Sequence, residues 1–130
     1  MFIYNLLVYI LSPLIILKII YDSVRRNNDT NFIRQRLGLA TCKRKENAIW
    51  LHASSVGEAK IALKLISIFK DKKLIEDIII TTTTKSSKTI LDKSGKDFQH
   101  YYLPFDFLLT MNRFIKSIKP KICIIIETEI

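Results

Sequence analysis

The feature that most constrains the fold is the alternation of short apolar segments with amphipathic ones from residue 48 onward. Four segments have the pattern of strands, namely AIWLHA, DIIITTTT, HYYLPF and KICIIIETE. Three helical patterns separate them, SSVGEAKIALKLISIFK, KSSKTILDKSG and LLTMNRFIKSIK. Strands that alternate with helices at this spacing form right-handed βαβ crossovers. The sequence therefore predicts an α/β fold, a parallel sheet with helices on both faces.

The first helical segment and the last strand indicate which residues build the core. In the helix, Ile61, Leu65, Ile68 and Phe69 fall at helical spacing, which predicts an apolar stripe. In the last strand the residues from 122 to 126 are apolar on both faces, which is typical of a strand covered from both sides. The sequence ends at Ile130 with no further helical segment, so we expect an incomplete Rossmann-like domain over residues 48–130.

The first 21 residues are almost uninterrupted apolar. As a helix, about 20 residues extend roughly 30 Å, close to the hydrocarbon thickness of a bilayer. We therefore expect residues 1–21 to form an N-terminal membrane-anchor helix. The alternatives are a buried helix of a soluble core and a helix lying in one leaflet. Lys18, Arg25 and Arg26 lie at or beyond the end of the run, which by the positive-inside rule places the following residues in the cytoplasm.

Residues 22–47 have the pattern of a basic connector that contains a short helix. The stretch NFIRQRLGLA is helical in character, and Gly38 is a typical residue just past a helix C-terminus. A cluster of Lys43, Arg44 and Lys45 precedes the first strand and is expected to be a charged loop. The connector therefore separates the expected anchor from the expected α/β domain.

Charge and cysteine content narrow the classes of partner. The net charge of +9 favours an anionic partner, such as a phosphorylated substrate or an acidic membrane surface. No nucleic-acid partner is expected, because aromatic residues are not interleaved with the basic ones. Cys42 and Cys123 lie far apart without a CxxC or a nearby histidine, so neither a disulfide nor a metal site is expected. Dinucleotide and P-loop motifs are also missing from the sequence.

The sharpest local motif is Ser54-Ser55-Val56-Gly57-Glu58, between the first strand and the first helix. Glu58 opens the helix, where backbone N–H groups and the macrodipole stabilise an ionised carboxylate. Such a carboxylate could act as a general base on a hydroxyl group. Ser55 and Glu58 also have the spacing of a capping box, which requires no catalytic role, and the two interpretations are compatible. Gly57 is interpreted as allowing a tight turn and the close approach of a ligand.

A second acidic motif, Glu127-Thr128-Glu129, stands at the carboxyl end of the last predicted strand. Alternation places Glu127 and Glu129 on the same face. Ligands of open α/β sheets bind beyond the carboxyl ends of the strands, so these carboxylates are candidate site residues. The alternative interpretation is that the strand has simply reached solvent.

Other polar residues are weaker candidates. His52 is interpreted as a core histidine with satisfied hydrogen bonds, and His100 and Asp106 as polar groups of loops. The run from Thr81 to Thr84 has two interpretations, hydroxyls that bind a phosphate and the β-branched end of a strand.

In their order and spacing these motifs resemble the 3-deoxy-D-manno-octulosonic acid (Kdo) transferases of lipopolysaccharide synthesis. The resemblance rests on the apolar N-terminus, the Arg-x-Arg-x-Gly element at residues 34–38 and the strand-turn sequence WLHASSVGE. It continues through the threonine-rich second strand, YLPFD, NRF and the closing ETE. It therefore extends through essentially the whole chain.

The resemblance implies the N-terminal Rossmann-like half of a GT-B glycosyltransferase, whose active site lies between two such halves. Enzymes of this family are inverting transferases that move Kdo from CMP-Kdo to a hydroxyl of a lipid A precursor, without a metal or other cofactor. On this basis Glu58 is expected to be the general base, and Ser55 and Gly57 to shape its turn. Glu129, and as second choice Glu127, is expected near the donor.

The resemblance also implies a location. The protein is expected on the cytoplasmic face of the bacterial inner membrane, held there by its N-terminal anchor. Its connector would lie close to lipid phosphates or anionic headgroups. The basic residues expected to face these groups are Arg25, Arg26, Arg34 and Arg36.

One departure from the family pattern bears on activity. In the family the acidic motif continues into a Trp-Pro segment and a second domain that supplies most of the donor site, and this sequence contains neither. We therefore expect a truncated, acceptor-side part of a Kdo transferase that is inactive alone. It would be active if a separately encoded C-terminal half supplied the rest, or if the sequence is a fragment of a longer enzyme. The alternative is a non-catalytic remnant or a membrane-bound module that binds lipid A precursors. A generic basic nucleotide-binding domain is a third hypothesis, without a phosphate-loop motif to support it.

Overall fold

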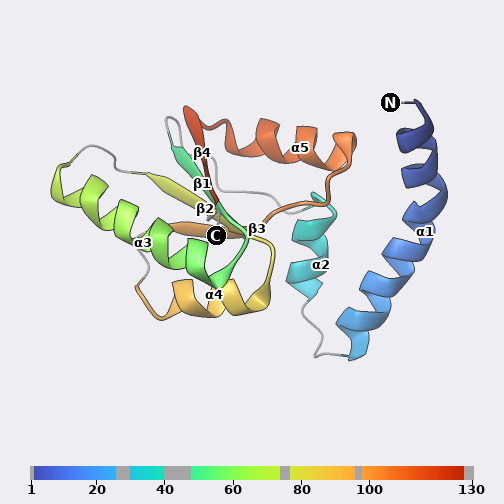
Figure 1. Ribbon diagram of the computed structural model, residues 1–130, viewed down its shortest axis with the longest axis horizontal. Coiled ribbons are helices and arrows are strands. Elements are labelled where there is room, and N and C mark those ends of the chain that lie inside the picture. The colour runs from blue at the N-terminus through green and yellow to red at the C-terminus, as the bar shows by residue number, and fades with distance from the viewer. Residues whose placement is uncertain (1, 26–29, 40–47, 74–76, 96–97, 128–130) are drawn as a thin grey trace. The chain divides into compact units, whose positions relative to one another are not determined.

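The computed structural model describes residues 2–25, 30–39, 48–73, 77–95 and 98–127 (Figure 1). The chain divides into two compact units, Met1–Arg34 and Gln35–Ile130. The first unit holds helix α1 and most of helix α2. The second holds a four-stranded parallel sheet with its flanking helices, and it contains the candidate site.

The N-terminal unit begins with a long helix, α1 (Phe2–Arg25), which contains Pro13, and continues into α2 (Thr30–Arg36). The predicted N-terminal helix is therefore present and extends beyond residue 21. Among the described residues, however, none of the helices is long and apolar enough to cross a membrane. The prediction that residues 1–21 form a membrane-spanning anchor is not confirmed.

The second unit has the α/β fold that the alternation of segments predicts. Its strands run parallel in the order β3-β2-β1-β4. The strands are β1 (Ile49–Ala53), β2 (Ile78–Thr82), β3 (Gln99–Tyr102) and β4 (Ile122–Ile126). The helices between them are α3 (Val56–Asp71), α4 (Lys85–Asp92) and α5 (Leu108–Ile118). The four predicted strands and three predicted helices of this region are confirmed, each somewhat shorter than its sequence pattern.

Apolar side chains fill both faces of the sheet. On one face, residues of α3 and α4 pack on β1, β2 and the end of β4 around Leu51, Ile80 and Leu91. Helix α5 lies on the other face (Figure 1). It packs there through Phe114 and Ile118. The Phe114 ring meets Trp50 edge-on, with ring centroids 5.5 Å apart. Two helices on one face and one on the other correspond to a Rossmann-like half.

The buried stripe of α3 differs from the predicted one. The side chains buried against the sheet are Ala59, Ala62 and Ile66, whereas Ile61 and Ile68 are exposed. Small alanines allow the helix backbone to lie close to the sheet. The stripe is therefore set by which residues face the strands and not by which are largest.

The parallel arrangement brings four strand ends to one edge of the sheet. There β1 leads into α3 and β2 into α4, so that the N-termini of both helices lie at this edge. In the register of the adjacent strands, Ala53 at the end of β1 lies beside Ile126 at the end of β4. The residues that follow them, Ser54 and Glu127, therefore leave the sheet at the same edge, where open α/β sheets bind ligands.

Candidate functional site

The turn from β1 to α3 holds Glu58 by a reciprocal set of hydrogen bonds. Ser55 is the N-cap of α3, and its Oγ accepts a bond from the Glu58 backbone N–H at 3.2 Å. The Glu58 Oε2 atom accepts bonds from the N–H groups of Ser54 at 2.6 Å and Ser55 at 3.1 Å. The capping box predicted from the spacing of Ser55 and Glu58 is therefore confirmed. It satisfies N–H groups at the start of the helix and fixes the carboxylate beside them.

The Glu58 carboxyl is ionised more readily than an ordinary glutamic acid. Desolvation by burial is the largest single influence on its pKa and acts to raise it. The N–H groups of Ser55 and Ser54, the Ser55 hydroxyl and the charge of His52 lower the pKa and together outweigh the effect of burial. The pKa of Glu58 therefore lies below its usual value, because its hydrogen bonds favour the charged form. Glu58 is an anion at neutral pH, with a half-exposed side chain.

Gly57 does not have the role in the turn that its position in the sequence indicates. It lies in the first turn of α3, and its φ is not among the positive φ values of the described glycines. A Cβ added there would meet only the Ser55 Oγ, at 3.9 Å. The turn is therefore made without a conformation that requires glycine. The open space above its Cα remains, so the prediction that a ligand comes close to Gly57 still stands.

A chain of hydrogen bonds connects the turn to the interior of the sheet. The Trp50 Nε1–H donates to the Thr81 Oγ1 at 2.8 Å, and the His52 Nδ1 lies 2.9 Å from the same oxygen. The other ring nitrogen, Nε2, lies 2.9 Å from the Ser54 Oγ. A neutral imidazole satisfies two such hydroxyls by donating to one and accepting from the other. The interpretation of His52 as a histidine with satisfied hydrogen bonds is confirmed, but its ring is half-buried and does not lie in the core.

The pKa of His52 is lowered, chiefly because its ring is partly removed from water. A backbone hydrogen bond with Thr81 and the charges of Glu58 and Glu127 act to raise the pKa, and the charge of Arg36 acts to lower it. The ring therefore lies in the fields of both candidate carboxylates and of one arginine.

The threonine run is occupied by contacts within the fold. Thr81 bonds Trp50 and His52, and the Thr82 Oγ1 lies 2.8 Å from the His100 Nε2. The Thr83 hydroxyl donates to the Ser54 carbonyl at 3.0 Å. Thr84 is the N-cap of α4 and its Oγ1 accepts from the Ser87 N–H at 3.2 Å. These bonds account for the four hydroxyls as strand-end and capping groups, which favours the structural interpretation over phosphate binding.

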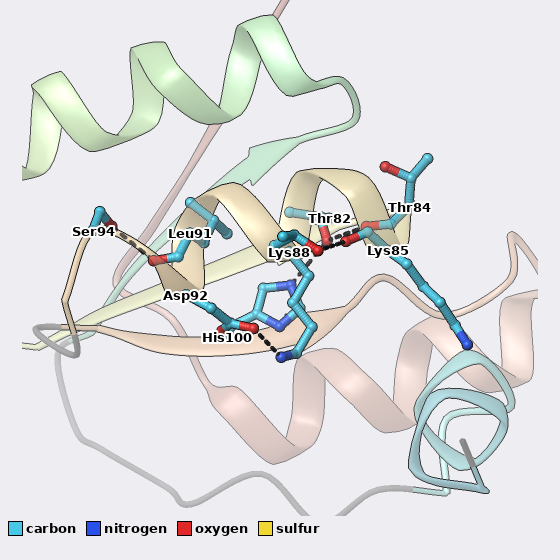
Figure 2. Close-up of polar contacts among 9 residues, drawn as sticks. Thr82, Thr84, Lys85, Lys88, Leu91, Asp92, Ser94 and His100 are labelled. Atoms are coloured by element: carbon cyan, nitrogen blue, oxygen red, sulfur yellow. Dashed lines mark hydrogen bonds and ion pairs between the residues drawn. The ribbon is translucent and has the colours of Figure 1, made fainter. Parts of the chain in front are cut away.

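His100 is not the loop residue that the sequence pattern predicts. It lies within β3 and is bonded to Thr82 (Figure 2). Its ring meets that of Tyr102 edge-on, with ring centroids 5.1 Å apart. The pKa of His100 is lowered to about 4, chiefly because burial removes the ring from water; the charge of Lys88 also lowers the pKa and that of Asp92 raises it. His100 is therefore neutral at physiological pH. The predicted strand segment HYYLPF begins with His100, which is interpreted as a loop group at the strand's end, whereas β3 begins at Gln99 and includes His100. Asp106, in contrast, is exposed and lies outside helix and strand, as expected.

The second acidic motif is only partly described. Glu127 is exposed and directly follows β4, beside the turn that carries Glu58. Both carboxylates therefore stand at the same edge of the sheet, as their positions after two strands predict. Glu129 lies outside the described residues, so its expected place near the donor stays a prediction.

The four basic residues of the connector differ in their exposure and contacts. Arg34 is exposed on α2, the side chain of Arg25 and the whole of Arg26 lie outside what the structure describes, and Arg36 is partly buried. The Arg36 guanidinium donates to the Leu103 carbonyl at 2.5 Å and lies over the Phe105 ring, 4.1 Å from its centroid. These contacts give Arg36 a role in the fold. A contact of these arginines with lipid phosphates stays a prediction.

The structure adds residues that the sequence pattern did not identify as part of the site. Ser54 holds Glu58 through its N–H and His52 through its hydroxyl, and Thr83 and Ser87 bond its carbonyl. One feature of the sequence could have indicated some of these residues. The polar segments SS and TTTT follow two strands whose ends a parallel sheet brings together. In the described residues no group of three His, Cys, Asp or Glu side chains could hold a metal ion.

Comparison with known proteins relates this geometry to a family. Residues 31–130 match the family model described as 3-deoxy-D-manno-octulosonic-acid transferase (kdotransferase). The chain is 33% identical over 133 aligned positions to a 3-deoxy-D-manno-octulosonic acid transferase of Haemophilus influenzae, covering 99% of this chain and 31% of that protein. It is 33% identical to a probable mitochondrial 3-deoxy-D-manno-octulosonic acid transferase of Arabidopsis thaliana, covering 98% of this chain and 29% of the relative.

A Rickettsia felis 3-deoxy-D-manno-octulosonic acid transferase is 35% identical, over 85% of this chain and 24% of the relative. No solved structure matches the chain. The chain spans about a third or less of the length of these relatives and is homologous to their N-terminal part. The matched region includes the whole described sheet and the turn that holds Glu58. On this evidence the chain belongs to the 3-deoxy-D-manno-octulosonic acid (Kdo) transferase family.

Proposed function

We propose that this chain supplies the acceptor-side part of a Kdo transferase, in which Glu58 removes the proton from the attacking hydroxyl. The observation that carries the proposal is the Glu58 carboxylate, ionised at neutral pH and fixed by two backbone N–H groups at the start of α3. A carboxylate of lowered pKa is a weaker base than one near neutrality. Its contribution to the rate would therefore come from a permanent negative charge in a fixed position.

The family supports a particular reaction. Kdo would pass from CMP-Kdo to a hydroxyl group of a lipid A precursor. In this step a bond forms between the acceptor oxygen and the sugar, the bond between the sugar and CMP breaks, and the acceptor proton moves to Glu58. Glu127 and Glu129 would lie toward the donor, since Glu127 leaves the sheet beside the Glu58 turn. The proposed step requires no metal.

Location is a further part of the proposal. The protein would work on the cytoplasmic face of the inner membrane, where α1 lies against one leaflet without crossing it. Support comes from the large apolar side chains of α1, of which Tyr9, Ile10, Leu14 and Leu17 are all more than half exposed. The transfer of such apolar atoms from water to the headgroup region lowers the free energy, so it favours binding of the helix to the membrane surface.

The remaining part of the site must come from outside the residues described. Since the chain spans about a third of the length of its relatives, we propose that a region equivalent to the C-terminal part of those relatives provides the donor-binding region. The chain alone is expected to be inactive. Transfer should therefore be assayed with this chain mixed with the C-terminal two thirds of the Haemophilus influenzae relative.

The deciding experiment compares Glu58→Gln with the unchanged chain in that mixture. Radiolabelled Kdo would be generated as CMP-Kdo and its transfer to a lipid A precursor followed by thin-layer chromatography. We expect Glu58→Gln to lower kcat by at least about a hundredfold, because the amide cannot accept the proton. Asp71→Asn is the matched control, since it removes an exposed carboxylate from the other end of the same helix and should leave transfer unchanged.

Substantial transfer by Glu58→Gln would contradict the assignment of Glu58 as the base. A mixture that binds the lipid A precursor but transfers nothing, with or without the substitution, would instead support the alternative of a non-catalytic binding module. Precursor binding can be measured separately by co-sedimentation with liposomes that contain it.

A further inference from the structure

The position of the Glu58 carboxylate depends strongly on one neighbouring residue. Of the two N–H groups that hold the Oε2 atom, that of Ser54 makes the shorter bond, at 2.6 Å against 3.1 Å for Ser55. A bond between an N–H and a carboxylate is charge-assisted and is among the stronger hydrogen bonds in proteins. A displacement of Ser54 would therefore move or release Glu58.

Ser54 is itself fixed from two sides. Its carbonyl accepts bonds from the hydroxyls of Thr83 at 3.0 Å and Ser87 at 3.4 Å, which belong to the neighbouring strand end and helix. Its hydroxyl lies 2.9 Å from the His52 Nε2. The hydrogen bond of the Ser54 hydroxyl differs from those of the carbonyl, because its partner, the His52 ring, is itself bonded to a residue in the interior of the sheet. The second nitrogen of the same ring reaches Thr81, which is fully buried.

The inner end of this connection is rigid. Thr81 lies in the middle of the sheet, where β2 pairs with β1, and it is the residue directly beside His52 in the register of the two strands. Its Oγ1 also accepts the indole N–H of Trp50, which packs against Phe114. The ring of His52 therefore spans from a fixed point of the core to the turn at the sheet edge.

We propose that His52 is a positioning residue for Glu58, acting through the hydrogen bond of its Nε2 atom to Ser54. The catalytic consequence rests on the proposed function of Glu58, whereas the geometric effect on the carboxylate does not. A histidine that served packing alone would need its bond to Thr81 but not the one to Ser54. The two bonds can be separated by substitution.

The test uses a matched pair of variants. Asparagine places its amide where the His52 Nδ1 stands, so His52→Asn keeps a partner for Thr81 and loses the bond to Ser54. Glutamine reaches the position of Nε2, so His52→Gln keeps the bond to Ser54. Both substitutions replace the titratable ring by a side chain that carries no charge at any pH. A difference between them therefore reports the bond to Ser54 and not the electrostatic effect of the histidine on Glu58.

Two measurements on the isolated chain follow the carboxylate directly. Carbon-13 NMR of the Glu58 carboxyl group gives its pKa, and hydrogen exchange gives the protection of the Ser54 amide. In His52→Asn we expect the pKa to rise toward its ordinary value and the Ser54 amide to exchange on the order of tenfold faster, as loss of one hydrogen bond implies. His52→Gln should stay close to the unchanged chain in both. Equal behaviour of the two variants would overturn the proposal.

Ser54→Ala keeps the test decisive if His52→Asn does not fold. It removes the outer partner of His52 but leaves the backbone N–H that holds Glu58. We expect it to reproduce the rise in the Glu58 pKa, and an unchanged pKa would overturn the proposal.

In the transfer assay His52→Asn should lower kcat by about ten- to a hundredfold with KM unchanged. Failure of Glu58→Gln to affect transfer would refute the proposed function but would leave the NMR result standing.

Discussion

Most polar side chains at the carboxyl edge of the sheet form hydrogen bonds with other polar groups at the same edge. The Thr82 hydroxyl bonds His100, the Thr83 hydroxyl bonds the Ser54 carbonyl, and Thr84 caps α4. Buried hydroxyls and imidazoles that are paired in this way avoid the cost of an unmet hydrogen bond, about 1–3 kcal/mol each. Glu58 differs from them, because its carboxylate takes its bonds from the backbone and its side chain remains half-exposed.

The lowered pKa of His100 predicts that the fold becomes less stable as the pH is lowered. Its pKa lies near the ordinary value of 6.5 in the unfolded chain and at about 4 in the folded one. Between these values the unfolded state binds more protons, so the free energy of unfolding falls as the pH is lowered through this window. The loss should be about 2 kcal/mol between pH 7 and pH 5. Urea unfolding at the two pH values measures it.

His100→Gln is the control for this prediction. Glutamine places its amide at the position of Nε2, which bonds Thr82 (Figure 2), but it does not titrate. Other groups of the chain also change protonation over this range, so the informative quantity is the difference between the two proteins. If both lose the same stability between pH 7 and pH 5, His100 is not responsible for the loss.

Among the elements, the end of α2 is the most constrained by space. Gly38 has a φ of +68° and donates its N–H to the Gln35 carbonyl at 2.9 Å, which confirms it as the residue that ends the helix. A Cβ added there would stand 3.0 Å from the backbone oxygen of Thr110 in α5. Glycine is therefore required twice, for the left-handed conformation and for the close approach to α5.

Gly38→Ala should lower the free energy of unfolding by about 2–3 kcal/mol. About 1–2 kcal/mol of this comes from the positive φ, and the remainder from the contact with the Thr110 backbone, which cannot move aside easily. Gly38→Asn separates the two causes, because asparagine tolerates a positive φ better but also carries a Cβ. We expect Gly38→Asn to lose less stability than Gly38→Ala in urea unfolding, because it keeps mainly the loss that comes from the contact with Thr110. Equal losses for the two variants would contradict a contribution from the positive φ.

At the scale of the whole sheet, the two edge strands differ. The edge at β3 is partly covered, since the Tyr102 N–H donates to the Gln35 side chain at 2.7 Å. At the other edge, β4 pairs only with β1 among the described residues, and Ile122 and Ile125 are exposed. An apolar strand with an unpaired edge is a template for pairing with another strand. The edge at β4 is therefore where association of the chain is expected.

Ile125→Lys should reduce self-association of the chain, measured by sedimentation velocity over a range of concentrations. Ile125 is 62% exposed, so a lysine there costs little core packing but opposes edge-to-edge pairing by its charge. Ile68→Lys adds the same charge at an exposed position of α3 and serves as the control. A chain that is monomeric without substitution, or equal effects of both lysines, would contradict the prediction.

The sequence by itself determined the order of the strands and helices, the parallel sheet and the capping box of Ser55 and Glu58. Each of these depends on local periodicity or on residues a few positions apart, which the sequence displays directly. It also placed Glu58 and Glu127 at one edge, because strands in a parallel sheet end together. The order β3-β2-β1-β4 and the partners of each strand became visible only in the structure.

Tertiary structure alone decided the contacts between residues that are distant in sequence. The connection of Trp50, Thr81, His52 and Ser54 depends on the register of β1 and β2, and a shift of one residue would turn these side chains to opposite faces. Burial of Ala59 instead of Ile61, and of His100 in a strand, likewise depends on how closely the helices approach the sheet. These contacts and burials follow from packing in three dimensions, and they cannot be predicted from local periodicity.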